Sequence, residues 1–487
     1  MRGTTEAAAD MGNQEFRDWA HRAAEWSADY LDTVADRPVR AQVRPGEIAG
    51  ALPAEPPETG EAMAAIFADF ERIVVPGMTH WQHPRFFAYF PANSSPPSVV
   101  AEYLTATMAA QCMLWQTSPA ATELETRVLD WLRKMIGLPN GFCGVIQDSA
   151  SGATLAALLT ARERALGFGG NREGLSGQPP VRVYCSAHAH SSIDKAVRIA
   201  GIGDAHLVKV PVHGERFGMD APALDRAIRA DRDAGRLPAA VVACLGGTSV
   251  GACDPLDEVA AVSRRHGLYL HVDAAWAGSA MICPEFRDLM RGAEQADSVV
   301  FNPHKWLFTN FDCSAHFVRD PKGLTDTLGV RAAYLRTLDR EGMVDYSEWS
   351  VPLGRRFRAL KLWFVIRSYG VEALREKIRR HVAWSGELAA LIEAHPDFEL
   401  VTRPMLSLFT FRYAPPGARD LDALNARLLA AINDDGRIYL TQTQHDGRFV
   451  IRFQVGQTET TRDDVMLAWS VIQDIAERST IGQAGRR

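Results

Sequence analysis

The sequence predicts an α/β protein with a mainly parallel central sheet, a helical N-terminal segment and a small α+β C-terminal domain. Between about residues 118 and 375, short apolar runs alternate with helical stretches, as in parallel strands joined by crossover helices. The preceding residues have mostly helical periodicity, and the following ones mix helices with strands. We therefore divide the chain into an N-terminal segment, a large domain and a C-terminal domain, at 1–95, 96–375 and 376–487.

The N-terminal segment is expected to contain two helices joined by an extended arm. Residues up to about Gly12 have the composition of a disordered leader. Apolar residues recur at helical spacing over 16–31, and 61–75 predicts a second helix. The residues between them, 38–57, are rich in Pro, Gly and Ala and favour an extended chain.

Five short apolar runs predict the strands of the large domain. They are 144–146, 181–185, 239–245, 268–272 and 298–301, with a helix expected at TELETRVLDWLRKMIGL before the first. In the C-terminal domain, FELVTR, LSLFTFR and RFVIRFQV predict strands among helices. No repeat or low-complexity tract interrupts this order.

Composition and charge limit the class of protein. The chain has 487 residues and a net charge of −6, which is too small to indicate a nucleic-acid or membrane partner. Its seven cysteines are scattered without a Cys-x-x-Cys pair, which fits a reducing compartment. No signal peptide or membrane-spanning run is evident. We therefore expect a cytoplasmic protein.

Two predicted strands end in residues that carry chemistry. Lys305 follows the strand at 298–301, and Asp273 ends the strand before it. Open α/β sheets bind ligands at the carboxyl ends of their strands, where a desolvated lysine can form a Schiff base with a carbonyl. Lysine and aspartate are also the two anchors of pyridoxal phosphate. The simpler alternatives are a surface lysine and a helix N-cap.

Three further strand ends present polar groups. Ser149–Gly152 open a helix whose N-terminus could meet a phosphate, although a plain serine N-cap explains them equally well. His188 and His190 are two apart, but no third metal ligand has matching spacing; a histidine here could instead stack on an aromatic ring. Gly246-Gly247-Thr248 forms a tight turn that offers a hydroxyl. Together with Lys305 and Asp273, these groups favour a cofactor site and no metal site.

The chain resembles the group II pyridoxal-phosphate-dependent decarboxylases, and within them the bacterial type of aromatic L-amino acid decarboxylase. The likeness runs from about Phe16 to Ile475. Its markers are HPRFFAYFPANSS, SPAATELE, HVDAAWAGSAMICPEFR, FNPHKWLFTNFDCSA and PLGRRFRALKLWFVIR. The resemblance implies the fold of the pyridoxal-phosphate-dependent transferases, fold type I, and a homodimer whose mobile loop reaches across the interface.

The resemblance also implies roles for individual residues. Lys305 would carry the cofactor as a Schiff base, Asp273 would pair with its pyridine nitrogen, and His190 would stack on its ring. Tyr334 matches the tyrosine of the mobile loop, which protonates the carbon that loses CO2. Residues expected near the phosphate, or near cofactor and substrate, are Ala150, Ser151, Thr248, Asn302 and His304. Arg452 is a further candidate for contacts near the site.

The resemblance favours an aromatic substrate. Its pocket candidates are Trp81, Tyr89, Phe90, Met113, Phe311 and Gly354; each aromatic side chain could equally be ordinary core packing. Glycine at 354 leaves room for an indole, whereas some relatives with serine there use histidine or hydroxyphenyl substrates. Ala92 and Met113 depart from the threonine and phenylalanine of animal members, which argues against a strict DOPA preference. We therefore expect L-tryptophan, with phenylalanine, tyrosine, DOPA and 5-hydroxytryptophan as alternatives.

Two other outcomes stay open on the same fold. Some relatives use oxygen to make aldehydes, and in those the loop tyrosine is often phenylalanine or the stacking histidine is asparagine. This chain has Tyr334 and His190, which favours simple decarboxylation to the amine. The chain could also be a catalytically silent binding protein, but the joint presence of Lys305, Asp273, His190 and Tyr334 argues against that.

Overall fold

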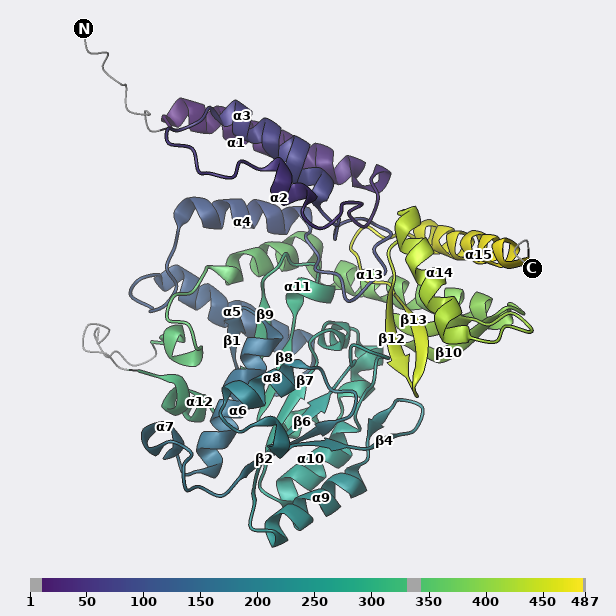
Figure 1. The fold of residues 1–487 in the computed structure, drawn as a ribbon. Coiled ribbons are helices and arrows are strands. Elements are labelled where there is room, and N and C mark those ends of the chain that lie inside the picture. The colour runs from purple at the N-terminus through teal and green to yellow at the C-terminus, as the bar shows by residue number, and fades with distance from the viewer. Residues whose placement is uncertain (1–10, 331–342, 485–487) are drawn as a thin grey trace.

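A seven-stranded sheet forms the centre of the molecule in the computed structural model, which describes residues 11–330 and 343–484 (Figure 1). The strand order is β1-β9-β8-β7-β6-β2-β3. The strands are β1 (Cys143–Gln147), β2 (Val181–Ser186), β3 (Leu207–Val210), β6 (Leu237–Cys244), β7 (Tyr269–Asp273), β8 (Ser298–Phe301) and β9 (Ser314–Val318). All five predicted strands are present, and the chain has the predicted mainly parallel sheet.

Besides the four-residue edge strand β3, the sequence did not predict strand β9. It lies between β1 and β8 and is antiparallel to both. Its sequence, SAHFV, carries a serine and a histidine, so it lacks the apolar run by which its neighbours were recognised. Every residue of β9 is nevertheless buried, because helices cover both faces of the sheet.

Helices cover the two faces of the sheet unequally. The face beneath α6 (Ala150–Ala165) and α8 (Ser192–Ile199) packs small aliphatic side chains. The opposite face carries the larger core, which joins the sheet to α5 (Pro119–Met135), α9 (Ala221–Asp233) and α10 (Leu256–Arg265). Shorter elements of this region are α7 (Gly170–Glu173), β4 (Val212–His213), β5 (Gly218–Met219), α11 (Pro303–Trp306) and α12 (Pro321–Leu328).

The C-terminal region is a four-stranded antiparallel sheet covered by helices. Its order is β10-β11-β13-β12, and its elements are β10 (Phe398–Met405), β11 (Leu408–Tyr413), α14 (Leu421–Asp435), β12 (Thr441–His445), β13 (Arg448–Gln454) and α15 (Arg462–Ala484). Strand β12 was not predicted, because TQTQH has no apolar alternation. These elements share a separate core that also takes in Phe87.

One long helix connects the two cores. Helix α13 (Arg358–Ala394) has a non-helical Gly370, with φ 70° and ψ 161°, where the helix kinks. Its first part packs on the core of the large sheet and its second part on the C-terminal core. The kink lies close to the boundary predicted at residue 375, and the three-part division itself stays a prediction.

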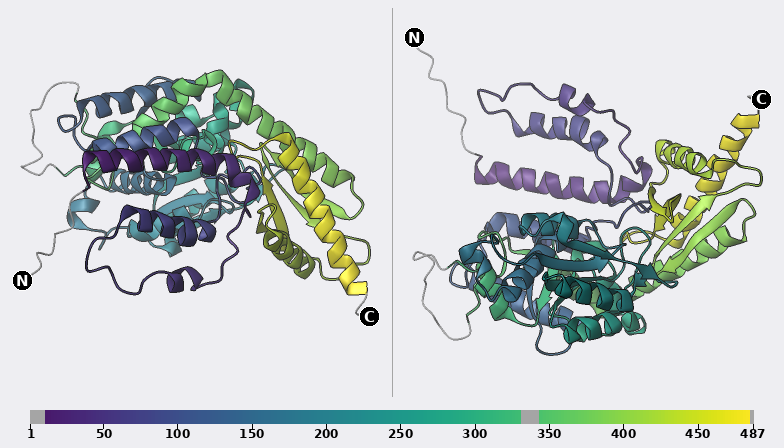
Figure 2. Two further views of the ribbon diagram at one scale, coloured as in Figure 1. Left: turned by 90° about the horizontal axis from the view of Figure 1, so that it is seen from above. Right: turned by 60° about the horizontal axis from the view of Figure 1, so that its bottom comes forward.

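The N-terminal residues form an arm beside α4 (Pro96–Met108) (Figures 1 and 2). The arm consists of α1 (Asn13–Thr33), α2 (Glu47–Ala51) and α3 (Met63–Asp69), which continues into a π turn at Phe70–Val74. Helix α2 interrupts the stretch predicted to be extended. Neither α1 nor α3 contains a buried residue; Trp19 contacts Phe67, and Trp26 contacts Phe70, at centroid distances of 5.6 and 4.9 Å.

The described residues contain neither a membrane-spanning helix nor a cluster of metal ligands. No helix within 11–330 or 343–484 has the length and apolar character to cross a membrane. In the same residues, no group of three or more His, Cys, Asp or Glu side chains could hold a metal ion.

Candidate active site

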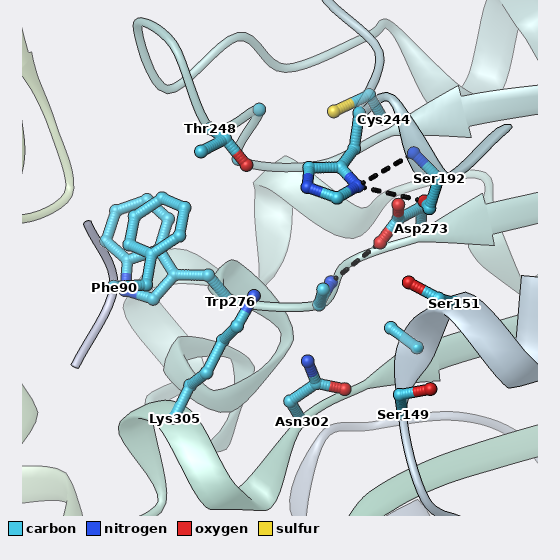
Figure 3. A pocket seen from close by; sticks show the side chains of 15 residues that line it. Phe90, Ser149, Ser151, Ser192, Cys244, Thr248, Asp273, Trp276, Asn302 and Lys305 are labelled. Atoms are coloured by element: carbon cyan, nitrogen blue, oxygen red, sulfur yellow. Dashed lines mark hydrogen bonds between the residues drawn. The ribbon is translucent and has the colours of Figure 1, made fainter. Parts of the chain in front are cut away.

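A cavity opens at the carboxyl ends of β2, β6, β7 and β8, facing the N-terminus of α6 (Figure 3). Ligands of open α/β sheets bind at this edge. The cavity is lined by Phe90, Ser149, Ala150, Ser151, His190, Ser192, Cys244, Gly246, Gly247, Thr248, Asp273, Ala275, Trp276, Asn302 and Lys305. It thus brings together residues from five chain segments that the sequence had singled out separately.

Lys305 enters the cavity from the short helix α11, which follows β8 directly. Burial lowers the pKa of its amine below the ordinary value, and the nearby Asp273 carboxylate opposes this shift. The amine lies 5.3 Å from the centroid of the Phe90 ring. A lysine whose pKa is lowered by burial has more of the neutral, nucleophilic amine near neutral pH.

Asp273 ends β7 and is buried. Its Oδ1 accepts a hydrogen bond from the backbone N–H of Ala275 at 3.1 Å. No helix begins at the next residue, because the first helical element, a 3₁₀ segment, spans Ala277–Ile282. The helix N-cap considered from the sequence is therefore not what holds this carboxylate.

His190 is held by the residue two positions after it. Its Nδ1 accepts a hydrogen bond from the backbone N–H of Ser192 at 3.1 Å and lies 2.9 Å from the hydroxyl of the same serine (Figure 3). Burial lowers the pKa of the imidazole, with Asp273 opposing and Lys305 adding to the shift. A neutral ring whose Nδ1 accepts a hydrogen bond carries its proton on Nε2. His190 therefore offers an N–H donor on its outer edge.

The first turn of α6 contributes Ala150 and Ser151 to the lining of the cavity, next to Ser149. Ser149 is its N-cap, and its Oγ accepts the N–H of Gly152 at 3.0 Å. A Cβ at Gly152 would lie 2.7 Å from Oδ1 of Asp148, so glycine permits this tight turn. The serine N-cap considered from the sequence is present, and it leaves other first-turn N–H groups without helical partners. Such a helix end suits an anion.

The Gly246-Gly247-Thr248 turn forms another part of the cavity wall, and Figure 3 shows the Thr248 side chain there. Gly246 has φ +80°, and a Cβ there would lie 2.6 Å from that of Ala277. Only glycine fits this approach, which brings the Thr248 hydroxyl to the cavity. On the other side, Asn302 accepts a hydrogen bond from the Ser314 hydroxyl at 2.7 Å.

Aromatic rings form the remaining wall. Phe90 stacks on Trp276 with centroids 4.4 Å apart, and Trp276 stacks on Trp306 at 4.9 Å. Trp276 was not among the residues predicted for the site, although it stands three positions after Asp273 in a motif that had been noticed. The prediction rested on polar side chains at strand ends, and Trp276 is an aromatic residue in the loop after such an end.

Other predicted residues lie outside this cavity. His304 is buried beside it, with Nδ1 accepting the N–H of Cys313 at 2.9 Å and its ring 4.8 Å from that of Phe311. Burial lowers the pKa of His304 to about 3. Phe311 is 62% exposed. Tyr334 lies outside the described residues.

The remaining substrate candidates are also apart from Lys305 within one chain. Trp81 and Tyr89 are partly exposed and stack with centroids 5.9 Å apart. Gly354 lines a second, more open pocket together with Gln111. The backbone carbonyl of Met113 accepts a hydrogen bond from Ser347. Phe90 is thus the one substrate candidate in the cavity of Lys305.

Arg452 reaches this region from β13 of the C-terminal sheet. It is buried and donates hydrogen bonds to the carbonyl of Ser249 at 3.1 Å and the hydroxyl of Thr441 at 3.0 Å. Its guanidinium lies 5.5 Å from the centroid of Phe90. The C-terminal sheet therefore contacts the aromatic wall directly.

A buried lysine, a carboxylate at the next strand end and a helix N-terminus fit the aldehyde, the ring nitrogen and the phosphate of pyridoxal phosphate. The fold and the cavity define a pyridoxal-phosphate-dependent enzyme of fold type I. Residues 45–414 match the pyridoxal-dependent decarboxylase conserved domain, and the chain belongs to this family of pyridoxal-phosphate-dependent decarboxylases.

Three comparisons support the assignment. The chain is 42% identical over 485 residues to the aromatic-L-amino-acid decarboxylase of Mus musculus, covering 96% of this chain and 98% of the relative. It is 38% identical over 485 residues to the phenylacetaldehyde synthase of Arabidopsis thaliana, covering 97% and 98%. The crystal structure of Oryza sativa TDC with PLP and tryptamine matches with a TM-score of 0.93 and 37% identity, covering 96% and 99%.

Proposed function

We propose that the protein removes the carboxyl group of an aromatic L-amino acid, with L-tryptophan preferred, and releases the arylalkylamine and CO2. The observation that carries the proposal is the cavity in which Lys305 and Asp273 face an aromatic wall of Phe90 and Trp276. Stacked aromatic rings favour an aromatic side chain in the substrate. The relative from mouse is named for such a reaction, and the rice structure holds tryptamine, the amine that tryptophan would give.

When bound, pyridoxal phosphate supplies an electron-poor ring that accepts the electron pair left when CO2 departs. We assign Lys305 to hold the cofactor aldehyde and Asp273 to keep the ring nitrogen protonated. A carboxylate about 4 Å from a cation contributes about 4 kcal/mol at an effective dielectric of ~20, equal to roughly three pKa units. The proton on the ring nitrogen is what makes the ring an effective electron acceptor.

The other proposed roles follow from position. Ala150 and Ser151 would meet the phosphate through backbone N–H groups of α6, with His304 near it, and Thr248 and Asn302 would contact the cofactor or substrate. His190 would stack on the cofactor ring and keep its Nε2–H for a substrate oxygen. Tyr334 would donate the proton that replaces CO2 on the substrate carbon.

We further propose a homodimer. Helix α4 exposes an apolar stripe of Val100, Tyr103, Leu104 and Met108, which are 54%, 48%, 40% and 54% exposed. The arm beside it has no buried residue in α1 or α3. Apolar surface of this extent usually marks an interface. A second copy seated here would also bring its own side chains toward the substrate candidates that stand apart from Lys305.

A second outcome of the reaction is kept, namely oxygen-dependent formation of the aromatic aldehyde. The Arabidopsis relative named for such an aldehyde matches over nearly its whole length. The presence of His190 and Tyr334 favours the amine. The seven free cysteines suit the cytoplasmic location that we propose.

A product assay tests the proposal. The purified protein with pyridoxal phosphate would receive an equimolar mixture of L-amino acids, and amines and aldehydes would be measured by mass spectrometry. We expect tryptamine to dominate. A dominant aldehyde would favour the second outcome, and histamine or the amine of glutamate would contradict an aromatic substrate. A yellow protein that forms no product would mean that the substrate lies outside the panel or that a partner is missing. A colourless protein without product would support a silent binding protein.

The product assay also tests Tyr334. Tyr334→Phe removes the proposed proton donor, so the product should shift from amine toward aldehyde and ammonia. An unchanged output of amine would show that another group protonates the substrate carbon.

A further inference from the structure

Three fully buried polar side chains, close in sequence to residues that line the cavity, are linked in a row by hydrogen bonds. His271 Nε2 is 3.1 Å from the hydroxyl of Thr154, and His271 Nδ1 is 2.7 Å from the hydroxyl of Ser298. All three side chains have no exposed surface. Buried polar groups that are mutually satisfied fix the relative placement of the elements that carry them.

Each member belongs to a different element of the cofactor site. Thr154 lies one turn into α6, after Ala150 and Ser151. His271 lies two residues before Asp273 on β7, and therefore points to the same face of the sheet. Ser298 begins β8, the strand that leads to Lys305, and is the register partner of His271.

The bond between Thr154 and His271 is the link between helix and sheet. Within the described residues, it is the one side-chain hydrogen bond from the first two turns of α6 to the central sheet. Burial lowers the pKa of His271 well below its ordinary value, with the neighbouring His316 adding to the shift. The ring is therefore neutral, with one nitrogen donating and the other accepting.

A rigid ligand makes this link consequential. The phosphate and the ring nitrogen of pyridoxal phosphate are attached to one aromatic ring, so their separation varies little. One end would lie at the N-terminus of α6 and the other at Asp273 on β7. A small shift of α6 along the sheet would leave the phosphate or the nitrogen without its partner.

We propose that Thr154 and His271 are positioning residues, which hold the N-terminus of α6 at the distance from Asp273 that one cofactor molecule can span. This inference rests on the proposed roles of α6 and Asp273. It assigns no contact with the cofactor to either residue.

The test compares two chemically identical substitutions on one helix. Thr154→Val removes the hydroxyl that reaches His271. Thr160→Val removes another buried hydroxyl, which donates to the carbonyl of Ala156 within α6. The dissociation constants of pyridoxal phosphate and of pyridoxal, which lacks the phosphate, would be measured on the full chain by absorbance titration. Melting temperatures would be recorded in parallel.

We expect Thr154→Val to weaken pyridoxal phosphate binding about fivefold to tenfold, the scale of one lost hydrogen bond. Pyridoxal binding should change by less than about twofold, because the link acts through the phosphate end. Thr160→Val should leave both constants unchanged, and Thr154→Ser, which restores a hydroxyl, should recover the affinity.

Three results would overturn the inference. They are an unchanged affinity in Thr154→Val, an equal loss in Thr160→Val, and a loss in Thr154→Val that pyridoxal shares in full. The last two would indicate general loosening of the helix. Absence of pyridoxal phosphate binding in the unsubstituted chain would instead count against the cofactor roles proposed above, so the two failures are distinguishable.

Discussion

The cofactor end of the cavity and the N-terminal arm are built differently. Near Lys305, the buried Asp273 carboxylate and the buried side chains of Thr154, His271 and Ser298 find hydrogen-bond partners within one chain. In α1 and α3, by contrast, no residue is buried, and aromatic rings contact mainly one another. The two regions therefore differ in what covers them: side chains of the same chain bury the polar groups around Asp273, whereas the arm and the α4 stripe present the surface that we assign to a second copy.

The largest expected loss of activity comes from substituting Lys305 in the cavity. Among the described residues that line the cavity, Lys305 is the only one with an amine that can form a Schiff base with an aldehyde. Lys305→Ala removes this amine, so amine formation should fall by about a thousandfold or more. Amine release and the visible absorbance of the purified protein measure the two consequences. A coloured, active variant would show that another lysine holds the cofactor.

Asp273→Ala should have the next largest effect. Loss of roughly three pKa units of proton stabilisation predicts about a hundredfold to thousandfold slower turnover. Some cofactor should remain bound, because Lys305 and α6 are unchanged. Turnover and bound cofactor are measured on one preparation. Near-normal turnover would remove Asp273 from this role.

A substitution on the α4 stripe should change the oligomeric state instead of the chemistry. Leu104→Glu places a charge on the α4 stripe, where the side chain is 40% exposed, and Leu391→Glu makes the same change on α13, where it is 41% exposed. Burying an unpaired charge should weaken the dimer by at least about tenfold for Leu104 alone. Analytical ultracentrifugation over a dilution series measures this. Equal behaviour of the two variants would place the interface elsewhere.

A fall in pH should lower the free energy of unfolding, because several histidines are buried in the neutral form. Burial lowers the pKa of His304 and His381 to about 3 and that of His316 to about 4. The unfolded chain takes up these protons near pH 6.5 and the folded chain does not, so stability present above pH 6.5 is lost as pH falls toward 4.

The loss from one such histidine reaches about 2 kcal/mol at pH 5. Denaturant unfolding at pH 7 and pH 5 measures it. His316→Leu should reduce the difference between the two pH values, since neither ring nitrogen of His316 has a hydrogen-bond partner among the described residues. An unchanged difference would mean that His316 is not buried in neutral form.

Gly354→Ser should give the smallest effect. A Cβ at this position would lie 3.2 Å from the Nε2 of Gln111, a flexible side chain that can move aside. We expect the KM for tryptophan to rise about threefold relative to that for tyrosine, the scale of a small change in pocket volume. A larger loss of kcat with unchanged KM would indicate a role beyond pocket size.

The elements that the sequence predicted well were those with one clear signal. Buried parallel strands are apolar throughout, so β6 and β8 were recognised directly. Strands β9 and β12 were not predicted because their residues include serine, histidine, threonine and glutamine. The edge strand β3 was not predicted either, and it has only four residues, LVKV. Tertiary contacts, rather than local preference, place such segments in a sheet.

The residues of the site likewise fall into those with a sequence signal and those without one. Ala150, Ser151, His190, Thr248, Asp273, Asn302 and Lys305 line one cavity, because strand ends of a parallel sheet meet at one edge. Trp276 and the Thr154–His271–Ser298 chain carried no motif of their own. Their positions depend on side-chain packing across elements, which spacing along the chain does not encode.

The stacked rings of Phe90, Trp276 and Trp306 have an optical consequence. Trp276 lines the cavity, and bound pyridoxal phosphate absorbs near the wavelengths at which indole emits. Energy transfer from this indole would dim the intrinsic fluorescence whenever the cofactor arrives. The intrinsic tryptophan fluorescence should therefore report cofactor binding without an added label.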